Sequence, residues 1–147
     1  MRDLKFRLRD KDDKILGYEH QRDGRWFYTL KGVNHWFEGF KFLNQIKYRD
    51  QFIGLLDKNG KEIYEGDIIR EGKIGEKIWG NVEITQECIG IVEYQSPNYD
   101  IKRIQVGIAK DKNGDHQFSE NRYDGVYEGW SDCEVIGNIY ENQELLK

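Results

Sequence analysis

The 147-residue sequence has little proline, methionine or cysteine and no long apolar segment. Its two cysteines, Cys88 and Cys133, are too few for the disulfide framework of a small secreted domain, and they favour a reducing compartment. No apolar run approaches the roughly 20 residues that cross a bilayer, and none follows Met1 as in a secretory signal. We therefore expect a cytoplasmic protein with no membrane partner.

Motifs that bind nucleotides or activate a nucleophile are absent as well. Neither GxGxxG nor GxxxxGK[ST] occurs, and there is no GxSxG nucleophile elbow. The three histidines, His20, His35 and His116, lack the spacing of a zinc site. We therefore expect no enzymatic activity, no metal and no cofactor, with Cys88 and Cys133 packed as small core residues.

Charge is distributed unevenly along the chain. Residues 1–50 hold 12 Lys/Arg and 8 Asp/Glu, a net charge of +4, whereas residues 51–147 hold 11 and 19, a net charge of −8. A protein that coats nucleic acid usually carries a strong basic excess, and this chain has a net charge of −4. We interpret the basic first third as a solvated strand surface, with a local nucleic-acid face as the alternative.

Aromatic residues make up 14% of the chain, which argues against global disorder. Short strand-like runs separated by turns predict an all-β, mainly antiparallel barrel or sandwich with little helix. In the first run, residues 4–9, the alternation places Leu4, Phe6 and Leu8 inward. The other predicted strands are residues 15–18, 26–30, 52–56, 61–64, 68–70, 82–85, 88–94, 104–108 and 133–140.

The segments between these strands carry recognisable turn signals. The tetrapeptide Asp-Lys-Asn-Gly occurs at residues 57–60 and again at 111–114, and an Asn-Gly pair favours a tight hairpin in which both residues have positive φ. Residues 36–48 have a rough helical spacing that predicts a short helix, and residues 141–147 predict a closing helical turn. Pro97 should end a strand, and residues 119–131 should form a loop.

Two groups of polar residues suggest chemistry. Glu62, Glu65 and Asp67 surround a turn, and such carboxylates can bind Mg²⁺ or divide acid and base roles, so a metal-dependent hydrolase is one hypothesis. We favour a structural role, in which Asp67 accepts hydrogen bonds from nearby backbone N–H groups. Asp115 and His116 resemble a general-base pair, but they follow a turn, where soluble residues are common.

The densest unusual feature is a group of seven aromatic rings within residues 26–42, interleaved with basic side chains. Rings surrounded by cations form the stacking platforms of single-stranded nucleic acid binding. We favour core packing as the role of these rings, followed by a protein interface and then by nucleic acid binding. The candidate binding face comprises Arg22, Arg25, Trp26, Tyr28, Lys31, Trp36, Phe37 and Lys41.

Three segments resemble the YopX family, small proteins of bacteriophages and prophages. Residues 4–11 (LKFRLRDK) are similar to the start of the family, although Arg9 stands where the family has tryptophan. Residues 51–69 (QFIGLLDKNGKEIYEGDII) are similar to its central signature, and residues 133–146 (CEVIGNIYENQELL) to its closing motif. Residues 90–94 (GIVEY) are similar to a weaker element of the family.

The resemblance implies a fold and an origin rather than an activity. It implies a small SH3-like β-barrel over residues 51–147, preceded by a β-rich and aromatic-rich segment over residues 1–50 that packs on the barrel. It also implies a phage or prophage protein in the cytoplasm of a bacterial host. The matched motifs consist of turn and core positions, among which the structural residues are Gly54, Asn59, Gly60, Gly66, Asp67 and Gly137.

We derive three functional hypotheses in order of preference. The first is a non-enzymatic accessory protein that binds a host or phage protein through an open strand edge. The second is a nucleic-acid-binding module that uses the basic, aromatic first third. The third is the metal-dependent hydrolase. Edge strands and aromatic side chains also favour self-association, so we expect a homo-oligomer.

Overall fold

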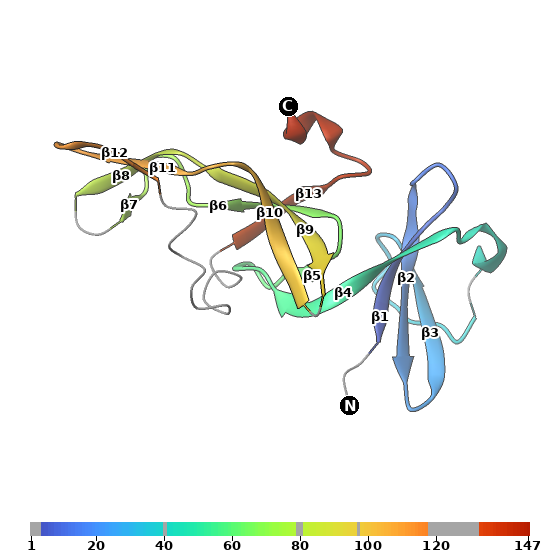
Figure 1. Ribbon diagram of the computed structural model, residues 1–147. Helices are drawn as coiled ribbons and strands as arrows, with labels where there is room; N and C mark the ends of the chain where they lie inside the picture. Colours follow the sequence, from blue (N-terminus) through green and yellow to red (C-terminus); the bar gives the residue numbers. More distant parts are fainter. Residues whose placement is uncertain (1–3, 40, 79–80, 97, 118–132) are drawn as a thin grey trace. The chain divides into compact units, whose positions relative to one another are not determined.

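The computed structural model describes residues 4–39, 41–78, 81–96, 98–117 and 133–147 (Figure 1). Its strands pair antiparallel throughout, and two short 3-10 segments are the helical elements among the described residues. The predicted all-β class with little helix is therefore confirmed. By its internal contacts the chain divides into two compact units, Met1–Ile53 and Gly54–Lys147. No helix in the described part of the chain is long and apolar enough to span a membrane.

The N-terminal unit contains four strands of a five-stranded sheet, whose order is β3-β2-β1-β4-β5, with β5 at Glu62–Tyr64. Lys5 faces His20 across β1 and β2, while Phe6 faces Gln51 across β1 and β4. The predicted runs near residues 4, 15, 26 and 52 are all strands, although β4 begins earlier than expected because its first residues pair with β1. The strands are β1 (Lys5–Arg9), β2 (Ile15–Arg22), β3 (Arg25–Leu30) and β4 (Tyr48–Leu56).

The prediction of a short helix over residues 36–48 is wrong for most of this range. Phe37 instead forms an antiparallel bridge with Tyr28 on the outer edge of β3, and its backbone N–H and C=O both bond to Tyr28 at 2.7 Å. The helical part is a 3-10 segment, η1 (Leu43–Gln45). The spacing of the aromatic residues suggested a helix, but Phe37 belongs to the bridge with Tyr28. Phe40 lies outside the described residues.

The C-terminal unit contains two four-stranded sheets, ordered β10-β9-β6-β13 and β12-β11-β8-β7. Each has two terminal strands, so no closed barrel is found among the described residues. The closing turn predicted for residues 141–147 is confirmed as η2 (Gln143–Leu146). The strands are β5 (Glu62–Tyr64), β6 (Asp67–Glu71), β7 (Lys77–Ile78), β8 (Val82–Gln86), β9 (Cys88–Gln95), β10 (Asn98–Gln105), β11 (Ile108–Asp111), β12 (Gly114–Gln117) and β13 (Cys133–Asn138).

The predicted strand over residues 104–108 is also wrong. β10 ends at Gln105 and β11 begins at Ile108, because the two strands belong to different sheets. The side chain of Gln86 donates a hydrogen bond to the carbonyl of Val106 at 2.7 Å within the connection. Ile104 is consequently 41% exposed. The predictions for Pro97 and for residues 119–131 fall outside the described residues.

The core of each unit is mostly aliphatic. Leu8 is fully buried as predicted and Phe6 is half-buried, but Leu4 is 40% exposed because it precedes the first strand. The basic side chains of β1, which the alternation placed in solvent, are buried: Arg7 and Arg9 are only 4% and 6% exposed. The buried apolar residues include Ile15, Ile53, Ile63, Ile68, Ile69, Ile84, Val92, Ile101, Ala109 and Val135.

Candidate functional site

The eight residues of the candidate binding face do not share one side of the N-terminal sheet. Arg22 faces Arg25 in the register of β2 and β3, so the two arginines lie on the same face. Trp26 and Tyr28 alternate with Arg25 along β3 and therefore lie on the opposite face. The two arginines are exposed, whereas the two rings are half-buried. Trp26 packs against Phe6, with ring centroids 6.3 Å apart.

The other four residues lie beyond β3. Because Phe37 bridges Tyr28, it lies on the same side as Tyr28, and it is 47% exposed. Trp36 lies on the other side of the sheet. Lys31 and Lys41 are exposed, and the Nζ of Lys41 lies 5.6 Å from the ring centroid of Phe42, its neighbour in sequence.

One face of the sheet combines cations and rings in a single row. Trp36 makes an edge contact with His20, with centroids 5.4 Å apart, and His20 lies 6.5 Å from Phe27. The Nζ of Lys5 lies 5.2 Å from the Trp36 ring and 6.0 Å from the Phe52 ring. We call these five residues, Lys5, His20, Phe27, Trp36 and Phe52, the cationic-aromatic face. Of these five, the candidate binding face includes Trp36 alone, and Phe27 belongs only to the group of seven aromatic rings. Sequence reasoning missed the other three, because the strand register that aligns them is not visible in the sequence.

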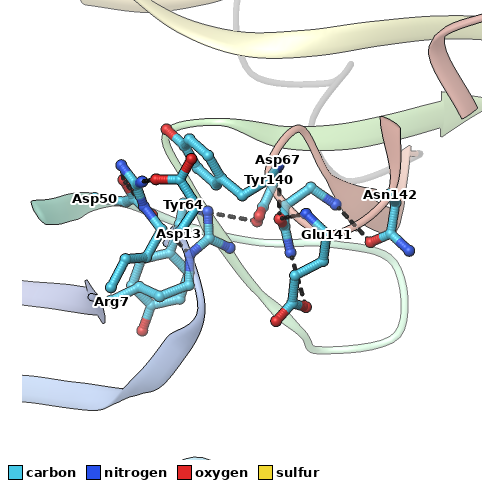
Figure 2. A network of polar contacts seen from close by, with 10 residues as sticks. Arg7, Asp13, Asp50, Tyr64, Asp67, Tyr140, Glu141 and Asn142 are labelled. Atoms are coloured by element: carbon cyan, nitrogen blue, oxygen red, sulfur yellow. Dashed lines mark hydrogen bonds and ion pairs between the residues drawn. The ribbon is translucent and has the colours of Figure 1, made fainter. Parts of the chain in front are cut away.

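Next to this row, a buried carboxylate binds two arginines (Figure 2). Asp50, which is 3% exposed, accepts hydrogen bonds from the Nε of Arg7 at 3.0 Å and from the Nε and Nη2 of Arg9 at 2.9 Å. Arg9 also pairs with Asp13, and its guanidinium lies 4.9 Å from the Tyr48 ring centroid. Two carboxylates thus neutralise two buried arginines.

The opposite face of the sheet carries a second ion pair. The Nε of Arg49 donates to Glu19 at 2.5 Å, and Glu19 is 3% exposed. Tyr28 faces Glu19 in the strand register. Burial, and then the negative charge of Glu19, raises the pKa of Tyr28 above its ordinary value, so this phenol stays protonated at neutral pH.

In the C-terminal unit, Asp57 joins the first Asp-Lys-Asn-Gly turn to the last strand. One carboxylate oxygen accepts bonds from the backbone N–H groups of Asn59 and Lys61, and the other from Val135 at 2.9 Å. Burial acts to raise the pKa of Asp57, but these three bonds outweigh it and lower the pKa below its ordinary value. Asp57 therefore connects residues 78 positions apart in sequence.

The Glu65-Gly66-Asp67 turn receives the closing motif. Gly66 has a φ of +86°, and a Cβ at this position would lie 2.9 Å from the Tyr140 ring. The carbonyl of Gly66 accepts a hydrogen bond from the N–H of Ile139 at 2.9 Å. Figure 2 shows Tyr140, Glu141 and Asn142 on this closing loop. Gly137 is similarly constrained, since a Cβ there would lie 2.6 Å from Asn142.

Two of the carboxylates around this turn, Asp67 and Glu62, accept hydrogen bonds from Tyr64. Asp67, 2% exposed, accepts a hydrogen bond from the N–H of Tyr64 at 2.8 Å, the type of bond expected for it (Figure 2). Glu62 accepts a bond from the Tyr64 hydroxyl at 2.7 Å, and Glu65 is half-buried. Within the described part of the chain, no group of three His, Cys, Asp or Glu residues is arranged to hold a metal ion. The side chain of His116 is outside the described residues, which leaves the Asp115–His116 pair a prediction.

Both cysteines are buried in the core, as predicted, and neither takes part in a disulfide. They face Glu71 from its two neighbouring strands, Cys88 on β9 and Cys133 on β13. Burial, reinforced by the charge of Glu71, raises the pKa of Cys88 to about 11. This thiol is therefore not a thiolate at neutral pH, which makes it a poor nucleophile.

The β9–β10 hairpin presents an edge in the C-terminal unit. β10 pairs with β9, and no other described strand pairs with its outer side. The apolar Tyr94 and Ile104 are 54% and 41% exposed on this hairpin, and the Tyr94 ring makes an edge contact with Tyr99 at 5.2 Å. Figure 1 shows β10 as a long strand beside β9.

Comparison with known proteins gives a family and a distant structural match. The model of the YopX protein family matches residues 5–147. Among solved structures, protein EF1440 from Enterococcus faecalis is similar, with a TM-score of 0.48 and 17% sequence identity over 100% of this chain and 99% of that chain. No curated relative matches the chain.

Proposed function

The chain belongs to the YopX protein family, and we propose that it is a non-enzymatic accessory protein of a phage or prophage that binds another protein. Its site of action would be the cytoplasm of the bacterial host. The proposal includes an SH3-like small barrel within residues 51–147. Small β-domains of this kind bind partner peptides by adding a strand to an open sheet edge.

The observation that carries this proposal is the outer side of β10, with which no strand in the described part of the chain pairs. An eight-residue edge strand offers a row of backbone donors and acceptors to an incoming chain. The exposed side chains of Tyr94 and Ile104 would contribute apolar contact at its two ends. Charged residues on the strand, among them Lys102, which lies 3.9 Å from Glu93, would disfavour indiscriminate pairing.

We propose an extended segment of a phage or host protein as the occupant of this edge. A second copy of the chain is the competing occupant, because two β10 edges could pair with each other and give the expected homo-oligomer. A mass near 17.5 kDa by light scattering at high concentration would exclude that competitor.

The experiment places a photo-crosslinking amino acid at Ile104 and, as a control, at Ile74, which is 62% exposed but lies outside the hairpin. A protein crosslinked from Ile104 and not from Ile74 is then purified, and hydrogen exchange is measured on the complex. We expect slower exchange of the β10 amides when the partner is bound. Unchanged exchange along β10 with a bound partner would refute the strand-addition proposal.

We do not favour the hypothesis of a metal-dependent hydrolase, because two of the carboxylates that suggested it form hydrogen bonds within the turn. Asp67 and Glu62 both bond to Tyr64, within the turn. The absence of enzymatic activity is part of the proposal, and it is supported by the raised pKa of Cys88 and by the turn-bonded carboxylates.

A further inference from the structure

We propose that the cationic-aromatic face of the N-terminal unit binds single-stranded nucleic acid. This inference is independent of the protein-binding edge, since it concerns a different unit of the chain. It rests on the strand register, which gathers rings and cations that are distant in sequence onto one side of the five-stranded sheet.

The rings of the cationic-aromatic face are spaced across the strands of the sheet. Phe27 lies on β3, at one edge of the sheet, and Phe52 lies on β4, three strands away in the order β3-β2-β1-β4-β5. Neighbouring strands are about 4.8 Å apart, so three strand spacings separate the two rings by about 14 Å. Trp36 lies between them through its contacts with His20 and Lys5. All three rings are half-buried. Sheets that bind single-stranded RNA carry rings side by side and stack two or three bases on them.

Positively charged side chains lie beside the rings. Arg22 and Arg25 face each other two residues beyond His20 and Phe27, on the same face, and both are exposed. Arg25 has one surface partner, Glu38, at 3.5 Å, and both side chains are about 70% exposed. An exposed pair of this kind is weak and screened by salt, so it does not prevent Arg25 from binding a phosphate. Lys5 adds a third cation within the row of rings.

The combination of rings and cations favours a single-stranded nucleic acid over other occupants. An apolar peptide would bury the rings but would supply no phosphate or carboxylate to the exposed Arg22 and Arg25. A single strand supplies both a flat base for each ring and a phosphate for each cation. Duplex DNA hides its bases in the stack, so it would use the cations and leave the rings unused.

The test is fluorescence anisotropy of the full-length protein with labelled oligothymidylate, the matching single-stranded RNA and a duplex, at several salt concentrations. Arg22→Gln with Arg25→Gln removes two exposed charges. We expect this variant to reduce the slope of log K against log salt by about 1.4, because each phosphate contact to a single strand contributes about 0.7. Phe27→Leu keeps apolar bulk but removes one ring, and we expect about 5- to 30-fold weaker binding.

Two control variants are matched to these. Lys73→Gln with Lys77→Gln, in the C-terminal unit, also removes two exposed positive charges. Trp26→Leu removes one half-buried ring, as Phe27→Leu does, but from the opposite face of the sheet. Neither control should change single-strand affinity. No binding at 25 mM salt, a preference for the duplex, or equal effects of the control and test variants would each overturn the proposal. The single-stranded DNA and RNA arms decide which strand is preferred.

Discussion

At the residue scale, single side chains connect segments that are far apart in sequence. Asp57 bonds to three backbone N–H groups, two in its own turn and one at Val135. The identical tetrapeptide at residues 111–114 has an aspartate, Asp111, whose carboxylate bonds to Asn113 at 2.7 Å. The two aspartates therefore form a natural comparison, because their local sequences are the same and their tertiary surroundings differ.

We expect Asp57→Asn to destabilise the protein by about 1.5–3 kcal/mol, because an amide cannot supply two charged acceptors to three N–H groups. Asp111→Asn should change the stability much less. Urea unfolding at pH 7 measures both. Equal losses in the two variants would mean that the bond to Val135 does not contribute.

The same carboxylate gives a pH dependence with a defined sign. The pKa of Asp57 in the folded state lies below its ordinary value of 3.8, so its contribution is present above about pH 4 and is lost as the pH falls through the folded-state pKa. We expect the stability difference between the natural protein and Asp57→Asn to shrink between pH 5 and about pH 2. A difference that stays constant over this range would contradict the assignment.

A comparison of Gly60 with Gly66 distinguishes the cost of backbone strain from the cost of a steric clash. Gly66 and Gly60 have φ values of +86° and +81°, but a Cβ would collide with Tyr140 only at Gly66 and would meet nothing within 4 Å at Gly60. We expect Gly60→Ala to cost about 1–2 kcal/mol and Gly66→Ala to cost about 1–3 kcal/mol more. Thermal or urea denaturation compares them, and equal costs would show that Tyr140 moves aside freely.

At the element scale, buried charge fastens β1 to β4. Asp50 on β4 binds Arg7 and Arg9 on β1, so these two basic side chains are buried. Lys5, on the same side of β1, is half-buried. Arg9 stands where the resemblance expects tryptophan, and its guanidinium lies over the Tyr48 ring. The position therefore keeps a packing role with a charged side chain.

We expect Asp50→Asn to destabilise the protein by about 3–5 kcal/mol, because it leaves two buried arginines without their shared carboxylate. Glu38→Gln, which removes the exposed partner of Arg25, is the control and should leave stability unchanged. Chemical denaturation of both variants checks the expectation. A small loss for Asp50→Asn would indicate that the arginines reach water.

At the scale of the whole molecule, the cysteines report on opening of the C-terminal unit. Cys88 and Cys133 are 1% and 0% exposed, and the pKa of Cys88 is about 11. We expect neither thiol to react with a thiol reagent at pH 7.5 in native buffer, and both to react at the rate at which the unit unfolds. Mass spectrometry after timed alkylation measures this, and fast labelling without denaturant would disprove it.

The sequence alone determined the all-β class, most strand positions and the buried cysteines, because alternation, turn residues and β-branched residues act locally. It could not reveal the turn geometry. Gly60 has a positive φ and Asn59 does not, and the turn is closed by a hydrogen bond from the Gly60 N–H to the Asp57 carbonyl.

Which residues share a face of the sheet depends on the pairing of distant strands. The register of β1, β2 and β3 brought Lys5, His20 and Phe27 together and separated Trp26 from Trp36. It also buried Arg7 and Arg9 beside an aspartate more than 40 positions away. Pairing between distant strands is set by the packing of the whole sheet, so short-range patterns in a single sequence do not contain it.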